Sequence, residues 1–250
     1  MTDLTGRTTI VVGASRGLGR GIATAFAEAG ARVVAVSRTA AAFPEPANGA
    51  GIIQPELVDA GEATVAGVLF DRYEPEAIIL VAGASPYMRP LHHQTWETFS
   101  VNWETDVRIA FHWLREALLR PLRPGARVVV FSSGAALNVN GSPLSGGYAG
   151  AKATQRFITA YAQEEAKRAG LELTFTTVLP KFAPMTGVGR PAVQAYAARY
   201  GQALEEYLEQ IGPHLTPEIA GAAVVELVRA DTASVAPAYV LSGTGLQELS

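Results

Sequence analysis

Short apolar runs rich in β-branched residues alternate along this chain with longer, alanine-rich segments in which apolar residues recur at helical spacing. The short runs predict strands, and the helical segments between them predict the crossovers of a parallel sheet. The predicted strands cover residues 8–12, 32–37, 51–55, 77–81, 127–132, 173–179 and 238–241. The predicted helices cover residues 17–29, 62–72, 96–119, 147–169, 191–211 and 217–229. We therefore expect an α/β fold: a single doubly wound domain over residues 1–250, with a parallel sheet of about seven strands and helices on both faces.

Two stretches lack either period. Residues 39–49 carry Pro44, Pro46 and Asn48-Gly49, which predicts a surface connection. The stretch between Lys181 and Pro191 is also rich in glycine and proline, and an amphipathic helix follows it. We expect residues 181–212 to form a substrate lid that moves over a pocket.

Composition narrows the class of protein. Of the 250 residues, 48% are hydrophobic and 17% are charged, as in a close-packed enzyme. The net charge is −3 and no basic stripe is present, so neither nucleic acid nor an anionic membrane is expected as a partner. The absence of cysteine excludes disulfides and thiolate ligands, and the four histidines lack metal-binding spacing, so no metal is predicted. The sequence shows no signal peptide and no apolar run long enough to span a bilayer, which predicts a cytoplasmic protein.

A glycine-rich turn follows the first predicted strand and opens the first predicted helix. It reads Gly13-Ala-Ser-Arg-Gly17-Leu-Gly19, so its spacing is GxxxGxG. Glycine tolerates the backbone angles of such a turn and lets the backbone approach a pyrophosphate at the helix N-terminus. A tight turn without a ligand is the alternative. The context favours a Rossmann-like dinucleotide site, with these candidate cofactor-binding residues: Gly13, Ser15, Arg16, Gly17, Leu18 and Gly19.

The end of the second predicted strand indicates which dinucleotide binds. A carboxylate there would bond the ribose 2′-hydroxyl of NAD, whereas arginine accommodates the 2′-phosphate of NADP. In this chain Ser37 holds the carboxylate position and Arg38 follows it, with Arg16 as a second cation in the turn. Two guanidinium groups and no acid favour NADPH, unless either arginine merely faces solvent.

Tyr148 and Lys152 form the second candidate motif. Residues four apart share one helix face, so the phenol and the ammonium are expected to point into the same pocket. A nearby cation favours the phenolate, which makes Tyr148 a plausible proton donor and acceptor. A YxxxK pair alone is often a solvated helix face, but its combination with the glycine turn predicts hydride chemistry. Ser132 and Ser133 end an apolar strand, either as a simple turn or at the edge of a site.

In combination these motifs resemble the short-chain dehydrogenase/reductase family over nearly the whole chain. The matching residues are Gly13, Gly17 and Gly19 in the cofactor turn, Ala82-Gly83 after the fourth strand, Ser133, the pair Tyr148 and Lys152, and Pro180 after the sixth strand. The resemblance implies that Tyr148 protonates the carbonyl oxygen of a substrate and that Ser133 hydrogen-bonds the same oxygen. It also implies that Lys152 holds the nicotinamide ribose and tunes Tyr148.

Four departures from the family pattern are present. The usual Asn-Asn-Ala-Gly is Leu80-Val81-Ala82-Gly83, and Lys181 follows Pro180 where the family has glycine. Ser133 precedes Tyr148 by fifteen residues, about two more than usual, which implies a longer loop over residues 138–146. The fourth departure is Asp106, which stands at the position of the family's catalytic asparagine, with Asn102 one turn earlier.

Asp106 has two interpretations. As an isostere it could order the water chain that the asparagine supports. Alternatively, its charge over-stabilises the Lys152 ammonium and cancels part of that cation's field on Tyr148. We hypothesise that activity survives with a changed pH optimum.

These observations predict an NADPH-dependent oxidoreductase that reduces a ketone or aldehyde. An NADP-binding regulatory or structural homologue with little turnover is the alternative, and alcohol oxidation is a third possibility. Phe182, Met185, Tyr196 and Tyr200 in the lid suggest an apolar or aromatic carbonyl substrate, whereas Lys181 either attracts an acidic group or is an ordinary surface lysine. The expected partners are a small carbonyl or alcohol compound and, because the two long helices resemble those at the family's two-fold interface, further copies of the chain in a homodimer or homotetramer.

Overall fold

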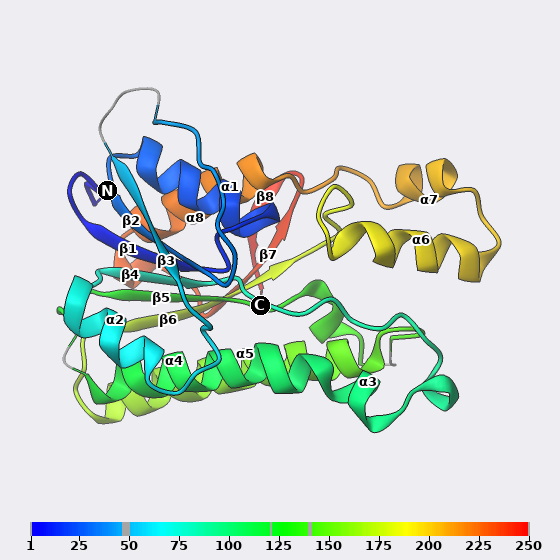
Figure 1. The fold of residues 1–250 in the computed structure, drawn as a ribbon, viewed down its shortest axis with the longest axis horizontal. Coiled ribbons are helices and arrows are strands. Elements are labelled where there is room, and N and C mark those ends of the chain that lie inside the picture. Colours follow the sequence, from blue (N-terminus) through cyan, green and yellow to red (C-terminus); the bar gives the residue numbers. More distant parts are fainter. Residues whose placement is uncertain (1, 47–50, 121, 140–141, 250) are drawn as a thin grey trace.

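The computed structural model describes residues 2–46, 51–120, 122–139 and 142–249, within which eight strands form one sheet (Figure 1). The strands are β1 (Thr8–Val12), β2 (Arg32–Ser37), β3 (Ile52–Leu57), β4 (Ala77–Leu80), β5 (Arg127–Phe131), β6 (Thr174–Pro180), β7 (Ala238–Ser242) and β8 (Gly245–Glu248). Their spatial order is β3-β2-β1-β4-β5-β6-β7-β8. The order reverses between β1 and β4, which opens a crevice at the carboxyl ends of these strands.

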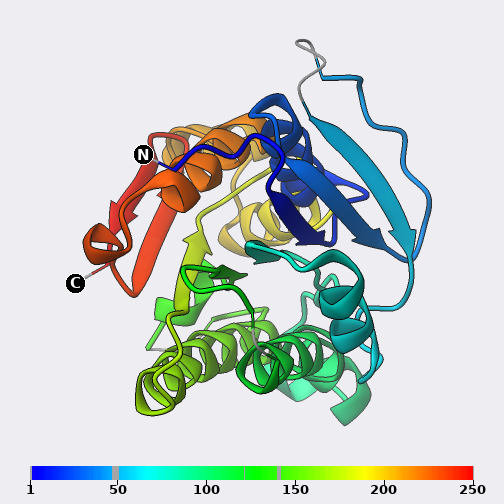
Figure 2. The ribbon, with the colours of Figure 1, turned by 90° about the vertical axis from the view of Figure 1, so that its left-hand side faces the viewer.

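Helices cover both faces of the sheet, as predicted (Figure 2). The α-helices are α1 (Gly17–Glu28), α2 (Val65–Tyr73), α3 (Trp96–Asn102), α4 (Arg108–Leu119), α5 (Gly146–Arg168), α6 (Gly189–Tyr200), α7 (Leu204–Gln210) and α8 (Pro217–Arg229). Short 3-10 helices span Leu91–His93 (η1), Gly134–Leu137 (η3) and Thr232–Ser234 (η4), and a π-helical turn spans Trp103–Val107 (η2). Helices α1 and α8 pack on one face, and α2, α4 and α5 pack on the other.

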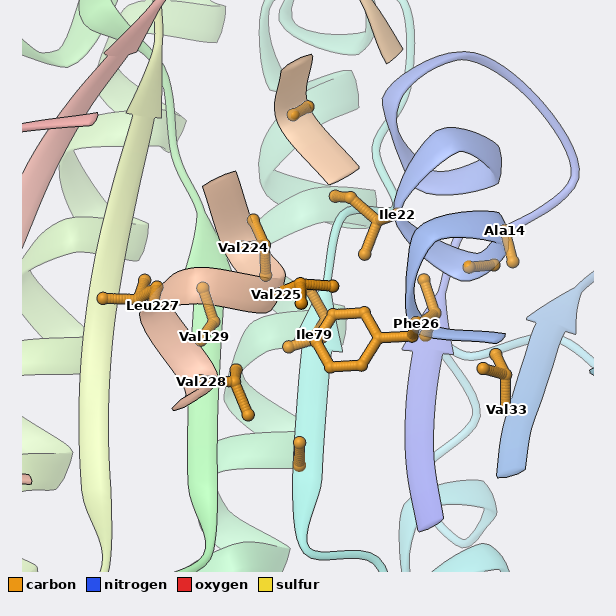
Figure 3. Packing of buried hydrophobic residues seen from close by; sticks show 14 of the residues in the cluster. Ala14, Ile22, Phe26, Val33, Ile79, Val129, Val224, Val225, Leu227 and Val228 are labelled. Atoms are coloured by element: carbon orange, nitrogen blue, oxygen red, sulfur yellow. The ribbon is translucent and has the colours of Figure 1, made fainter. Parts of the chain in front are cut away.

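The strand pattern explains why both faces need a cover. Successive side chains of a strand point to opposite faces, so Val11 packs under α1 and α8 while Ile10 and Val12 pack under α2, α4 and α5. Phe26 of α1 and Val225 of α8 lie in the first of these two cores (Figure 3). Each fully buried side chain of this kind contributes about 1.5–3 kcal/mol to folding. The paired cores fix the parallel strands, and with them the crevice.

The strand boundaries follow the prediction closely. β1 and β2 have the predicted bounds, and the other five differ by one or two residues at one end or at both ends. The edge strand β3 continues through Pro55 to Leu57, because an edge strand tolerates a residue that cannot donate to the ladder. The eighth strand is additional to the seven expected. It pairs antiparallel with β7 across a tight turn between Ser242 and Gly245.

Two predicted helices are each divided. The segment predicted as one helix over residues 96–119 is α3, the π-helical turn η2 and α4. A π-turn holds an extra residue, which changes the direction of the side chains, and here Asp106 is fully buried. The helix predicted over residues 191–211 is α6 followed by α7, because Gly201 has a left-handed φ of 67° that ends α6.

Residues 39–46 hold no helix or strand, and residues 47–50 of that predicted connection lie outside the described part of the chain. Of the helices in the described residues, none is both long and apolar enough to span a bilayer. Helices α6 and α7 project beyond the sheet on the side where α5 begins (Figure 1).

Candidate active site

A cavity of about 1090 Å³ lies at the carboxyl ends of the parallel strands. Its wall brings together the glycine turn, the loops after β2, β4 and β5, the π-turn η2, the start of α5 and the lid segment. Every catalytic or cofactor-binding residue predicted from the sequence lines it: Gly13, Ser15, Arg16, Gly17, Leu18, Gly19, Ser37, Arg38, Ala82, Gly83, Asp106, Ser133, Tyr148, Lys152 and Pro180. A cavity of this volume accommodates a dinucleotide together with a small substrate.

The glycine turn fits an anionic ligand. Gly13 has a φ of 93°, and a Cβ there would lie 2.6 Å from the backbone nitrogen of Ala82, so only glycine fits. In the described chain Arg16 makes no side-chain cap and the first turn of α1 carries no acid. The N–H groups at the start of α1 are therefore available to a pyrophosphate group, which the helix dipole also favours. The residues present fit a dinucleotide cofactor.

The end of β2 offers cations rather than a carboxylate. Arg16 and Arg38 are exposed and both line the cavity. The Ser37 hydroxyl donates a hydrogen bond to the backbone oxygen of Thr39 at 2.7 Å, which shapes the loop after β2. This rim therefore suits a phosphate group on the adenosine ribose.

Two serines follow the end of β5 and have different roles. The Ser132 hydroxyl donates to the backbone oxygen of Lys152 at 2.7 Å and so fixes the helix to the strand. Ser133 caps η3 by accepting from the backbone N–H of Ala135 at 3.2 Å, and among the described residues its own O–H has no acceptor. Ser133 and Tyr148 thus line the same cavity, although the loop between them is longer than the family pattern.

Lys152 forms a buried ion pair with Asp106, and the Lys152 Nζ lies 3.0 Å from Asp106 Oδ2. The exposed fractions of these side chains are 5% and 0%. Lys152 Nζ also lies 5.6 Å from the centre of the Tyr148 ring. Burial alone lowers the pKa of Lys152, but attraction to Asp106 and Tyr148 outweighs burial and raises this pKa above its ordinary value of 10.5.

The Asp106 carboxylate is held by neutral donors as well. Its Oδ1 accepts from the backbone N–H of Ala84 at 2.8 Å, and the Asn102 amide lies 3.3 Å from both of its oxygens. A Cβ on Gly83 would lie 2.7 Å from Asp106 Oδ2, so glycine is required beside this carboxylate. The direct ion pair favours the interpretation of Asp106 as a counter-ion of Lys152.

Gln155 is a member of this cluster that the sequence analysis did not single out. Its side-chain oxygen accepts from Lys152 Nζ at 2.8 Å, and its side-chain nitrogen donates to the backbone oxygen of Asp106 at 2.9 Å. A signal was available, because Tyr148, Lys152, Gln155 and Thr159 form a polar stripe at helical spacing on a helix that covers a sheet.

The lid carries an aromatic cluster. The Phe182 ring lies 6.3 Å from the rings of both Tyr196 and Tyr207, and Tyr200 stacks on Tyr207 at 6.2 Å. All four side chains line the cavity, and Tyr207 was not identified from the sequence. Met185 was expected there as well, but its side chain is 82% exposed and lies outside the cavity wall, because the chain turns outward between Ala183 and Thr186.

The lid also contacts the start of the candidate catalytic helix. The Tyr196 hydroxyl lies 2.7 Å from the Ser145 hydroxyl and 3.1 Å from that of Ser142. Ser145 is the residue before α5, three positions from Tyr148. Lys181 is exposed and lines the cavity at the base of the lid.

Comparison with known proteins assigns the family. The model of the short chain dehydrogenase family matches residues 7–196, which include the glycine turn, Ser133, Tyr148 and Lys152. The chain belongs to the short-chain dehydrogenase family. This is a family of oxidoreductases that use nicotinamide cofactors, and the sequence-based resemblance is confirmed.

Curated relatives of this short-chain dehydrogenase are reductases of modest identity. L-Xylulose reductase of Homo sapiens is 33% identical over 105 residues, 42% of this chain and 43% of that protein. D-Erythrulose reductase of Gallus gallus is 30% identical over 131 residues, 51% and 53% of the two chains. Hydroxynaphthalene reductase-like protein Arp2 of Metarhizium robertsii is 30% identical over 172 residues, 63% and 61%. The chain therefore spans about half the length of the first two relatives.

Solved structures of the family share the fold. Levodione reductase superposes with a TM-score of 0.82 at 20% identity, covering 96% of this chain and 97% of its own. A short chain dehydrogenase from Mycobacterium avium superposes with a TM-score of 0.76 at 22% identity, covering 100% of this chain and 86% of its own. A metagenomic short-chain oxidoreductase in complex with NADP gives 0.72 at 18% identity, with coverage of 96% and 98%. At these identities the likeness establishes the fold.

The buried ion pair between Lys152 and Asp106 should stabilise the folded protein. Asp106→Ala removes the counter-ion of a buried ammonium and should cost about 3–5 kcal/mol in free energy of unfolding at neutral pH. Because the pKa of Lys152 is raised in the folded state, the ion pair contributes its full amount to the free energy of unfolding below pH 10.5. This contribution is lost as the pH rises through the folded-state pKa. In the variant, burial without a counter-ion lowers the Lys152 pKa. The difference in free energy of unfolding between the two proteins should therefore become smaller as the pH rises.

Urea unfolding of both proteins from about pH 7 to about pH 10.5 measures this difference. Glu164→Ala is the control, because it removes the partner of Lys167 from an exposed pair and should change little at any pH. If the loss of unfolding free energy in Asp106→Ala stayed constant over this pH range, the prediction would be wrong.

Proposed function

We propose that this protein is an NADPH-dependent carbonyl reductase. The observation that carries the proposal is the shared cavity, in which Ser133 and Tyr148 face the same space as the glycine turn of the cofactor site. A hydroxyl, a phenol and a nucleotide cradle in one cavity are what reduction of a ketone or aldehyde needs. The reductase relatives support this direction of reaction.

In the proposed mechanism, side chains of the protein donate the proton and the hydrogen bond to the substrate. When bound, a nicotinamide cofactor supplies hydride to the carbonyl carbon. Negative charge then develops on the carbonyl oxygen, where the Tyr148 O–H donates its proton and the Ser133 O–H donates a hydrogen bond. The fixed ammonium group of Lys152 lies beside Tyr148 and acts on it through its positive charge. These donors act most strongly when the charge is largest, so they stabilise the transition state more than the bound substrate.

The residues that would hold the cofactor follow the wall of the cavity. The turn from Gly13 to Gly19 would bind the pyrophosphate, and Ala82-Gly83 would lie against the nucleotide. Arg16 and Arg38 would bind the 2′-phosphate, which is the reason to propose NADPH over NADH. The NADP complex of one structural neighbour agrees with this choice.

The lid points to an apolar or aromatic carbonyl substrate. Phe182, Tyr196, Tyr200 and Tyr207 form a connected aromatic wall on the cavity, and aromatic rings favour stacked or edge-on contacts with a planar ligand. The segment over residues 181–212 would serve as the substrate lid. Lys181 at its base would tolerate an acidic group on the substrate.

Tyr148→Phe should abolish turnover and leave cofactor binding intact, because it removes only the hydroxyl group that donates the proton. The measurement is NADPH consumption across a panel of aromatic and aliphatic ketones, aldehydes and quinones, with NADPH affinity measured by fluorescence. Tyr161→Phe on the exposed face of the same helix is the matched control and should retain activity. Tight NADPH binding without turnover on any compound would overturn the reductase and favour an NADP-binding regulatory homologue.

Arg38→Asp should reverse the cofactor preference, because a carboxylate repels the 2′-phosphate and accepts from the 2′-hydroxyl of NADH. We expect kcat/KM with NADPH to fall by about tenfold to a hundredfold and that with NADH to rise, since one bidentate charged contact is lost. Arg20→Asp is the control: Arg20 is exposed on α1, outside the cavity wall, and carries the same charge change. An equal loss in both variants would refute the assignment of Arg38.

We also propose that two copies associate through the outer faces of α4 and α5. Phe111 and Leu119 on α4, and Phe157 and Tyr161 on α5, are each more than half exposed. Adjacent exposed apolar side chains of this kind mark association surfaces. The family's two-fold interface uses the corresponding helices, so a homodimer or homotetramer is the expected assembly.

Phe157→Glu should convert the assembly into a smaller species, because it places a charge at the centre of the apolar face. Sedimentation velocity at micromolar concentration measures the change. Val68→Glu on α2 is the control, because Val68 is 50% exposed outside that face and should leave the mass unchanged. A monomeric native protein would reject the proposed assembly.

A further inference from the structure

Helix α5 carries amide and hydroxyl side chains on the face that it buries. Lys152, Gln155 and Thr159 are at most 4% exposed, although this face lies toward the sheet and the neighbouring helices. A buried carboxamide is unfavourable unless both of its ends are hydrogen-bonded. Gln155 meets that condition through groups that belong to the active site.

The Gln155 side chain joins the two members of the buried ion pair. Its oxygen accepts from Lys152 Nζ at 2.8 Å, and its nitrogen donates to the backbone oxygen of Asp106 at 2.9 Å. One contact therefore fixes the cation on α5. The other fixes the backbone of the π-turn η2, whose geometry turns the Asp106 side chain inward.

The Lys152 ammonium has as many protein acceptors as it has N–H bonds. They are Asp106 Oδ2 at 3.0 Å, Gln155 Oε1 at 2.8 Å and the backbone oxygen of Phe131 at 3.2 Å. Each acceptor belongs to a different element, η2, α5 or β5. Three acceptors in three directions define the position of Nζ more sharply than its counter-ion alone.

We propose that Gln155 is a positioning residue for the reaction: it sets the place of Lys152 relative to Tyr148 and keeps Asp106 beside that cation. The inference rests on the proposed function for its kinetic consequence, but not for its structural one. Gln155 acts through Lys152 and takes no part in proton transfer. The titratable groups that face Lys152 are Asp106 from η2 and Tyr148 from α5, so the local charge depends on this arrangement.

Gln155→Met tests the positioning role, because methionine has a similar length and forms neither hydrogen bond. We expect kcat for carbonyl reduction to fall on the order of tenfold to a hundredfold, the usual consequence of a small displacement of a catalytic group. KM for the carbonyl should stay within about twofold, because Gln155 does not touch the substrate.

The matched control is Gln163→Met on the same helix. The Gln163 amide also joins two backbone groups, Leu173 and Phe175, but far from Lys152. The Gln163→Met variant should lose as much free energy of unfolding as Gln155→Met and keep the native kcat. Equal kcat losses in the two variants would reduce Gln155 to a structural residue and overturn the proposal.

A second measurement is independent of turnover. The chain has only the lysines Lys152, Lys167 and Lys181, so ¹⁵N-labelled lysine gives few ammonium signals. Lys167 and Lys181 are exposed and exchange their hydrogens quickly, whereas the buried ammonium of Lys152 should give a persistent signal at neutral pH. In Gln155→Met, hydrogen exchange at Lys152 should accelerate by about tenfold or more. Unchanged exchange would overturn the proposal even if the protein reduced no carbonyl in the panel.

Gln155→Glu serves if the methionine variant does not fold. As a carboxylate it keeps an acceptor for the Lys152 N–H but cannot donate to the backbone oxygen of Asp106. The Lys152 signal should therefore persist, while kcat should fall because the π-turn η2 loses the contact that holds it. A native kcat would refute the arrangement, and loss of the Lys152 signal would show that Oε1 is not its acceptor.

Discussion

The buried ion pair between Lys152 and Asp106 is the interaction on which the rest of the site depends. Removing two charges from water costs several kcal/mol for each ion, and one contact at 3.0 Å offsets this cost only if further hydrogen bonds assist. The structure supplies them from Asn102, from the backbone N–H of Ala84 and from Gln155. These donors and acceptors come from α3, from the loop after β4 and from α5, so the site forms only when those elements meet.

The sheet brings the elements together. Because the strand order reverses between β1 and β4, the loops after these strands diverge and leave the crevice that the glycine turn and Gly83 line. The Ser132 hydroxyl then fixes α5 to the end of β5, which places Tyr148 and Ser133 in one cavity. Close packing continues to the carboxylate, since Gly83 leaves no room for a side chain beside Asp106. The cofactor cradle and the ion pair therefore constrain each other.

The sequence predicted the layers and the cavity lining because both depend on local patterns. Continuous apolar runs, buried on both faces of the sheet, give β1 and β2 their predicted bounds, and glycine spacing identifies the turn at Gly13. The π-turn was not predictable, because residues 96–119 keep a helical pattern and only the tertiary demand for a buried Asp106 breaks it. The polar stripe on α5 could have indicated that Gln155 is buried, but its bonds to Lys152 and to the backbone of Asp106 depend on tertiary contacts that the sequence pattern does not show.

The carboxylate of Asp106 beside Lys152 changes the electric field that acts on Tyr148. A lone ammonium acts on the ring through its charge, whereas Lys152 with Asp106 at 3.0 Å acts as a dipole, whose field falls off faster with distance. At 5.6 Å from the ring centre, the effect of such a pair depends on how it is oriented as well as on its presence. A protein that relies on an oriented pair needs that orientation held, and the hydrogen bonds of Gln155 to both partners hold it. The orientation of the Lys152–Asp106 pair therefore links the polar face of α5 to the field at Tyr148.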